Sequence, residues 1–102
     1  MWLSSNEKKI QFEDTGWIEP PAYPYGVYLD DSDNRGADDK ICISDHIVTI
    51  ELYTEFIDPD AKKAITDLFI EKALAYRDLG SMWIDSERHW QTVFEISYTE
   101  KI

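Results

Sequence analysis

The acidic stretch LDDSDNRGADDK is the segment of the chain whose residue types most suggest chemistry, because it holds five aspartates, one asparagine and one glycine. A calcium loop of the EF-hand type needs oxygen ligands at positions 1, 3 and 5, glycine at 6 and glutamate at 12. With Asp31 at position 1, Asp33 and Gly36 occupy positions 3 and 6. Position 5 is then Arg35 and position 12 is Cys42, which do not supply the required oxygens. The spacing excludes a calcium sensor and leaves at most a weak surface site.

Nucleophilic catalysis needs an activated Ser or Cys within hydrogen-bond reach of a base. Cys42 and His46 are four residues apart, which on a strand is roughly 13 Å at about 3.3 Å per residue. A buried structural cysteine is the better interpretation. The stretch SERH, which ends at His89, has no nucleophile elbow around it, and we interpret it as a polar turn into the last strand. An enzyme is the third hypothesis and would need a conserved pocket around His46 or His89, and the sequence predicts no catalytic residues.

The sequence also predicts no metal and no cofactor. Its two histidines and single cysteine lack the spacing of a transition-metal site. Only four glycines are present, and they are not clustered as in a phosphate-binding loop. Carboxylate pairs for acid–base chemistry can be chosen at so many positions that no pair is informative.

Composition bounds the class of protein. A chain of 102 residues with 43% hydrophobic and 14% aromatic content predicts one packed domain, residues 1–102. The net charge of −11, with ten basic and twenty-one acidic residues, argues against nucleic acid and anionic membranes as partners. We find no apolar run of membrane-spanning length and no signal peptide. A soluble protein of a reducing compartment is therefore expected.

Hydrophobic periodicity predicts the elements of the core, residues 25–98, after an irregular lead-in over residues 1–24. YGVYL (25–29) predicts a short strand, and the acidic stretch after it a loop. KICISDHIVTIELYT (40–54) predicts a long strand, with a bulge or tight bend where SDH (44–46) interrupts the alternation.

The segment DPDAKKAITDLFIEKA predicts a helix that is capped by Asp58, has Pro59 at its first position and ends between Lys72 and Tyr76. MWID (82–85) predicts a short strand, and HWQTVFEISY (89–98) a strong one. The expected fold is α+β, in the order β-β-α-β-β: a mostly antiparallel sheet of about four strands with one amphipathic helix packed on it.

Aromatic residues are more numerous than a core of this size should need, with four tryptophans and six tyrosines. Most of them are expected to pack in the core or along strand edges. Tryptophan and tyrosine are also enriched at protein–protein interfaces, so a self-association surface is the second interpretation.

Three stretches, PPAYPYGVYLDDSDNRGADDK, VTIELYTEFIDPDAK and WIDSERHWQTVFEI, together resemble the small tail completion proteins of long-tailed phages and Gram-positive prophages. These are also called tail terminator or head–tail joining proteins. The resemblance covers roughly residues 19–97. Two features depart from it: the family's first helix has no clear counterpart in residues 1–18, and the link ALAYRDLGSM is longer than expected.

The resemblance implies a homo-oligomeric, typically hexameric ring that stacks on the tail tube and joins the head connector, without enzymatic activity or cofactor. The chain would act in the host cytoplasm during assembly and in the virion tail afterwards. The acidic stretch would be an assembly loop, since Asn34 and Gly36 suit a tight turn. An acidic intracellular binding module, immunity- or inhibitor-like, for a basic protein is the alternative. The candidate assembly contacts are Asp33, Asn34, Gly36, Asp38, Trp83, Glu87 and Trp90.

Overall fold

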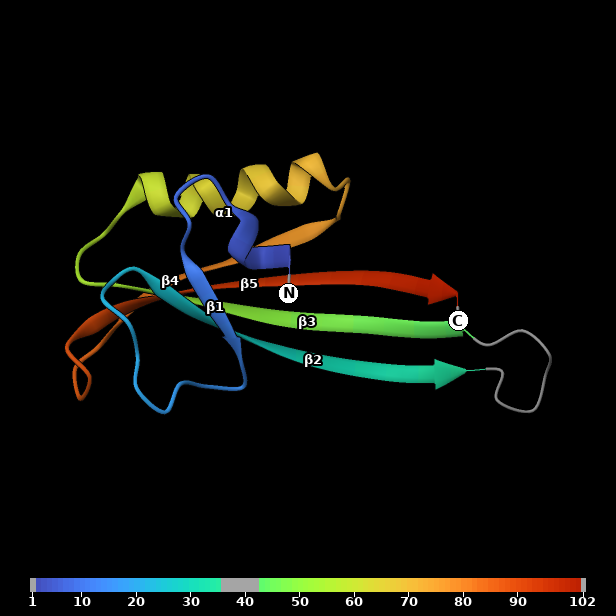
Figure 1. Ribbon diagram of the computed structural model, residues 1–102, viewed down its shortest axis with the longest axis horizontal. Helices are drawn as coiled ribbons and strands as arrows, with labels where there is room; N and C mark the ends of the chain where they lie inside the picture. The colour runs from blue at the N-terminus through green and yellow to red at the C-terminus, as the bar shows by residue number, and fades with distance from the viewer. Residues whose placement is uncertain (1, 36–42, 102) are drawn as a thin grey trace.

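The fold was determined as a computed structural model, which describes the backbone of residues 2–35 and 43–101 and the side chains of residues 2–31 and 46–98. The described residues form one α-helix and a five-stranded mixed sheet, so the predicted α+β class is confirmed. Figure 1 shows the helix lying along one face of the sheet. The elements, in chain order, are η1 (Trp2–Ser5), β1 (Gln11–Asp14), β2 (Tyr25–Arg35), β3 (Ile43–Thr54), α1 (Pro59–Glu71), β4 (Tyr76–Ile84) and β5 (His89–Lys101).

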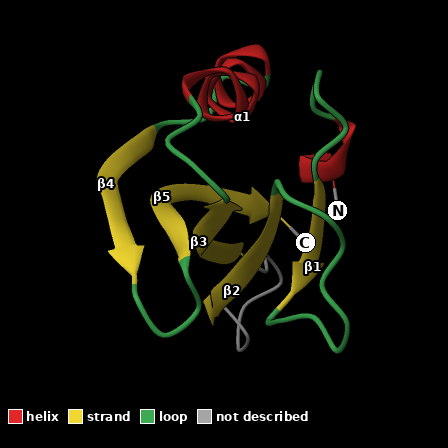
Figure 2. Cartoon of the chain, turned by 90° about the vertical axis from the view of Figure 1, so that its left-hand side faces the viewer, coloured by secondary structure: helices red, strands yellow, loops and turns green. Residues whose placement is uncertain are grey.

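The strands lie in the order β1-β2-β3-β5-β4, so β1 and β4 are the two edge strands of the sheet, as Figure 2 shows. β1 runs parallel to β2, whereas the other neighbouring pairs are antiparallel. The expected mostly antiparallel sheet is therefore present, with a first strand that the sequence did not reveal.

The hydrophobic core lies between α1 and one face of the sheet. β3 and β5 contribute alternate residues in matched register, Val48 opposite Ile96 and Ile50 opposite Phe94, and all four are fully buried. From α1, Phe69 packs edge-to-face on Phe94, with ring centroids 5.7 Å apart. Because side chains alternate across a strand, every second residue of β3 and β5 points to the opposite face, which α1 does not cover.

Helix α1 begins where the sequence predicts. Asp58 is the N-cap, and its Oδ1 accepts a hydrogen bond of 3.1 Å from the backbone N–H of Ala61, while Pro59 occupies the first turn. The helix ends at Glu71 with Lys72 as its C-cap, at the start of the predicted range. Ala73, the last residue of the segment that predicts the helix, lies beyond it, with a φ of 55°.

The first 24 residues are more regular than predicted. Leu3 of η1, Ile10 just before β1 and Phe12 of β1 lie in the core. The buried Asn6 amide fixes the turn between η1 and β1, because it donates to the carbonyls of Leu3 (2.7 Å) and Ile10 (2.9 Å) and accepts from the Ile10 N–H (2.9 Å). The lead-in is therefore part of the packed domain.

Phe12 lies against Gly26 of β2, where a Cβ would overlap the Phe12 ring and come within 2.8 Å of the Glu51 carbonyl oxygen. Glycine at position 26 allows β1 to approach the sheet. This close contact helps to hold β1, a strand of only four residues, beside β2.

Three predicted boundaries are wrong. β2 does not end at residue 29 but continues through the acidic residues to Arg35, paired with β3. No bulge interrupts β3 at Ser44–His46, since each of these residues pairs in register with both β2 and β5. β4 begins at Tyr76, well before the predicted strand, and contains a register shift between Asp78 and Ser81. In each case pairing with a neighbouring strand overrides weak local β propensity.

Candidate functional site

The acidic residues predicted as an assembly loop are only partly described. Asp33 and Asn34 belong to β2, opposite Asp45 and Ser44 of β3, so the prediction that they lie in a loop is wrong. Gly36 and Asp38 lie outside the described residues. That this region contacts another subunit stays a prediction.

The other predicted contacts surround the hairpin between β4 and β5. Trp83 and Trp90 are directly opposite each other, with ring centroids 5.7 Å apart and an interplanar angle of 63°. The turn at residues 85–88 is closed by a 2.7 Å hydrogen bond from the Arg88 N–H to the Ile84 carbonyl, which confirms the predicted turn. Glu87, in this turn, lines a pocket on the face of the sheet opposite α1. The structure thus brings the two tryptophans together and separates Glu87 from them.

The outer edge of β4 carries apolar side chains that remain exposed to solvent. In the part of the chain that the structure describes, β4 pairs with β5 and no strand pairs with its other side. The relative exposures of its large apolar residues are 37% for Tyr76, 50% for Leu79, 57% for Met82 and 40% for Trp83. An edge strand with exposed apolar residues is a template for pairing with another chain.

The other edge of the sheet, formed by β1, is less accessible to a further strand. β1 has four residues, and the Phe12 N–H donates to the Ser4 hydroxyl at 3.1 Å. A side chain from η1 therefore already occupies a backbone donor of β1. The two edges of the sheet are not equivalent, and β4 is the accessible one.

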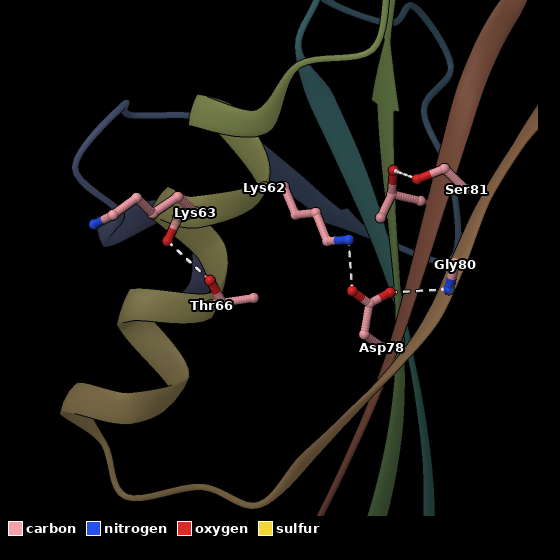
Figure 3. Close-up of polar contacts among 7 residues, drawn as sticks. Lys62, Lys63, Thr66, Asp78, Gly80 and Ser81 are labelled. Carbon is pink, nitrogen blue, oxygen red and sulfur yellow. Dashed lines mark hydrogen bonds and ion pairs between the residues drawn. The ribbon is translucent and has the colours of Figure 1, made fainter.

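Polar contacts fix the first half of β4 against α1, as Figure 3 shows. Lys62 Nζ lies 2.5 Å from Asp78 Oδ2, and Asp78 Oδ1 accepts a 2.9 Å hydrogen bond from the Gly80 N–H. The hydrogen bond from Lys62 is the main cause that lowers the pKa of Asp78. Beyond the register shift, the Ser81 hydroxyl hydrogen bonds with that of Thr92 of β5 at 2.7 Å. The exposed edge is thus held in a defined position.

The face opposite α1 carries a cluster of aromatic rings, built from β2, β3, β5 and the β1–β2 connection, which passes on that side of the sheet (Figure 1). Tyr25 contacts Tyr53 with ring centroids 5.4 Å apart, and Tyr53 contacts His89 at 4.6 Å. Trp17 packs edge-to-face on Tyr25 at 6.3 Å. Tyr23 stacks on Tyr25 at 5.3 Å, and its hydroxyl hydrogen bonds with His89 Nδ1 at 3.0 Å.

Trp17, Tyr25, Tyr53 and His89 border an open depression of about 360 Å³. We call it the aromatic pocket and define it by these four residues together with Glu51 and Glu87. The Tyr53 hydroxyl donates to Glu51 Oε1 at 2.9 Å and accepts from Gln91 Nε2 at 3.2 Å. Burial is the main cause that raises the pKa of Tyr53 to about 12, and Glu51 adds to it. Burial, followed by the charges of Tyr23 and Glu87, raises the pKa of Tyr25.

The sequence did not reveal this pocket, because its residues come from positions far apart in the chain. The signal that was present is the alternation of β2 and β3, which places Tyr25 and Tyr53 on the face that the core residues do not use. Their register, directly opposite each other, depends on the pairing of the two strands. The SERH stretch predicts a polar turn at His89, whereas the His89 ring contacts Tyr23 and Tyr53 and lines this pocket.

Two further observations bear on the class of protein. Among the described residues, no group of three or more His, Cys, Asp and Glu side chains is arranged to hold a metal ion. The helix that the structure describes is too short and too polar to cross a membrane.

Two surfaces of the described residues are suited to contact with another molecule. The edge of β4 offers backbone groups and apolar side chains to a further chain, and the aromatic pocket offers rings and carboxylates to a ligand. The two are adjacent at the end of β4, where Ile84 also lines the pocket, but Leu79 lies outside the pocket lining. Neither a scan against models of protein families nor a search of curated proteins finds a match to the chain.

Proposed function

We propose that the chain is a structural assembly protein of a phage or prophage tail, which self-associates into a ring that caps the tail tube at the head–tail joint. The accessible edge of β4 is the observation that carries the proposal, and the resemblance of residues 19–97 to tail completion proteins supplies the context. In this proposal the partners are other copies of the chain, the tail tube and the head connector, and the chain is not an enzyme.

Self-association through β4 follows from its chemistry. Natural edge strands are usually protected by charged side chains, by proline or by a covering segment. In β4 such protection is confined to the first half, where Arg77 pairs with Glu95, Asp78 pairs with Lys62 and a register shift follows. Leu79, Met82 and Trp83 are exposed and carry no charge. Packing against a second chain would bury these side chains.

A closed ring needs two different surfaces, because a contact between identical surfaces gives a two-fold dimer. The second surface that we propose is the part of the α1-free face away from the aromatic pocket. There Leu29 of β2 and Ile47 of β3 are 39% and 49% exposed. A β4 edge that packs against this face in the next copy would make a head-to-tail contact that closes after several copies.

The test is the solution mass of the purified chain, measured by light scattering across a concentration series and followed by electron microscopy. We expect a ring, or a monomer that forms one at high concentration or when tail tubes are added. Leu79→Lys places a charge on the β4 edge and should shift the assembly to monomers. Ile70→Lys is the matched control, since Ile70 is equally apolar and 65% exposed but lies on α1.

Three outcomes contradict the proposal. A chain that stays monomeric at every concentration, also with tail tubes present, would show that it does not self-associate. A two-fold dimer and no larger species would show that β4 pairs with itself and that no ring forms. Equal effects of Leu79→Lys and Ile70→Lys would show that the contact does not involve β4.

An acidic binding module for a basic protein is the second candidate function. The aromatic pocket favours it, because two carboxylates and no lysine or arginine line the cavity. The net charge of −11 favours a basic partner in the same way. A stable monomer that binds a basic protein through the pocket would support this function over ring assembly.

A further inference from the structure

We propose that the aromatic pocket is a binding site for the cationic group of an arginine or lysine side chain that a partner protein presents. The site lies on the sheet face opposite α1, at the end of the sheet where the β4–β5 turn and the β1–β2 connection approach each other. This inference does not rest on ring formation. It concerns a different surface from the edge of β4 and a different ligand chemistry.

The rings supply the first half of the recognition. A cation within about 6 Å of an aromatic ring centroid is attracted by the negative face of the ring, most strongly by tryptophan. Tyr25 and His89, which are 8% and 5% exposed, form the floor, and the half-buried Trp17 and Tyr53 stand beside them. The Trp17 indole is fixed by a 2.8 Å hydrogen bond from Nε1 to the Gly26 carbonyl. The aromatic walls are therefore in place before a ligand arrives.

Carboxylates supply the second half. Glu51 and Glu87 both line the cavity, and within the described part of the chain neither forms an ion pair. Glu51 accepts the Tyr53 hydroxyl through Oε1, and a carboxylate has capacity for further donors. The negative charge of Glu87 reaches the floor of the pocket, since it contributes to the raised pKa of Tyr25. The pocket combines aromatic rings with two carboxylates that form no ion pair among the described residues.

Size and access favour a side chain over a free ligand. The cavity of about 360 Å³ is at the low end of the range for small-molecule sites. Its rim is exposed at Gly16, Pro20 and Glu87, so a guanidinium or ammonium group can enter at the end of a flexible stem that remains attached to a protein. Guanidinium stacks on aromatic rings and forms paired hydrogen bonds with carboxylates, which makes arginine the better fit. The charge of −11 attracts a basic partner from a distance.

The experiment is a titration of the full chain, labelled at its tryptophan indoles, followed by nuclear magnetic resonance at constant ionic strength. The probe is N-acetyl-arginine N-methylamide, and the matched control probe is the corresponding citrulline compound, which has nearly the same shape but no charge. The Leu79→Lys variant is titrated in parallel. Its substitution lies on β4 outside the pocket, so the titration separates pocket occupancy from ring formation.

We expect the arginine probe to shift the Trp17 indole resonance in a saturable way and the citrulline probe to bind at least about tenfold more weakly, since hydrogen bonds to charged groups are the strong ones. Combining Glu51→Gln and Glu87→Gln should weaken the arginine probe by on the order of tenfold, while Gln keeps an acceptor for Tyr53. Glu71→Gln, on α1 and away from the pocket, should leave binding unchanged.

Four results would overturn the proposal: equal binding of the two probes, unchanged binding in the Glu51/Glu87 double variant, no saturable shift of Trp17, or saturable shifts confined to resonances outside the pocket. The last would show that the net charge alone attracts the cation. If Leu79→Lys abolishes rings and retains the Trp17 shift, the pocket stands independently of the assembly.

Discussion

Gly26→Ala is the substitution for which the structure gives the sharpest expectation. At this position of β2 a Cβ would overlap the ring of Phe12 and lie 2.8 Å from the Glu51 carbonyl oxygen. The first obstacle is an aromatic ring held in the core, and the second is backbone, so neither moves aside cheaply. Placing extra atoms in such a packed site costs typically about 1–3 kcal/mol.

An opposing effect has to be subtracted. Replacing glycine by alanine restricts the unfolded chain and, where the native backbone allows it, stabilises the fold by about 0.4–1 kcal/mol. Gly26 does not have a positive φ, so this gain applies. The net expectation is a loss of up to about 2.6 kcal/mol in the free energy of unfolding, centred near about 1.3 kcal/mol. The central value lowers the melting temperature by roughly 5–10 °C for a domain of this size.

Urea unfolding monitored by tryptophan fluorescence measures this loss, and Gly16→Ala is the matched control. A Cβ at Gly16 would meet no atom within 4 Å. Because Gly16 has no positive φ either, its variant should be as stable as the parent chain or up to about 1 kcal/mol more stable. If Gly26→Ala proves as stable as Gly16→Ala, the close approach of β1 to β2 is wrong.

A double-mutant cycle with Phe12→Ala identifies the obstacle. Phe12→Ala alone should cost about 3–5 kcal/mol, the range for a buried aromatic residue. Gly26→Ala should cost less in that background than in the parent chain, because the ring is gone and only the Glu51 carbonyl remains close. Strictly additive costs would show that the Phe12 ring does not limit the size of residue 26.

Two further predictions concern Tyr53 and Asp58. The pKa of Tyr53 is raised from 10.0 to about 12, so the folded state holds the phenolic proton more tightly than the unfolded state. The contribution of Tyr53 to stability is therefore complete below pH 10 and is lost as the pH rises towards 12. Across this window the free energy of unfolding of Tyr53→Phe should fall less steeply than that of the parent chain. If both free energies fall equally with pH, the pKa of Tyr53 is not raised. Asp58→Ala should cost about 1 kcal/mol by removing the N-cap of α1. Asp58→Asn keeps a side-chain acceptor and should retain most of the stability that Asp58→Ala loses. Thermal unfolding monitored by far-UV circular dichroism measures both variants.

How far the sequence predicts this fold depends on whether an element carries its own signal. α1 has a capping aspartate, a proline in its first turn and apolar residues at helical spacing, so its start follows from local chemistry. The central parts of β3 and β5 are also predicted well, since Val48, Ile50 and Leu52 alternate with polar residues. In both elements the buried face can be recognised without knowledge of the partner.

The elements that were missed lack such a signal. β1 buries one residue of four, Phe12, and gains its place by packing on Gly26. The residues of β4 up to Trp83 are all exposed, so the strand shows no alternation of buried and exposed positions. The acidic end of β2 is held in the sheet by its register with β3, although aspartate disfavours strands. These elements are set by tertiary pairing, which no local pattern encodes.

The same distinction explains why the two proposed surfaces are separable. β4 is accessible because the strand order places it at the edge of the sheet. The aromatic pocket forms because the register of β2 and β3 places Tyr25 opposite Tyr53 on the face that α1 does not cover. Leu79 lies on the edge strand, whereas Glu51 and Glu87 line the pocket. Leu79→Lys should therefore remove self-association and leave the binding of a cation intact, and the Glu51/Glu87 double variant should do the reverse. Loss of both properties in either variant would mean that the pocket is completed by a neighbouring copy, so that ring assembly and cation binding form one site.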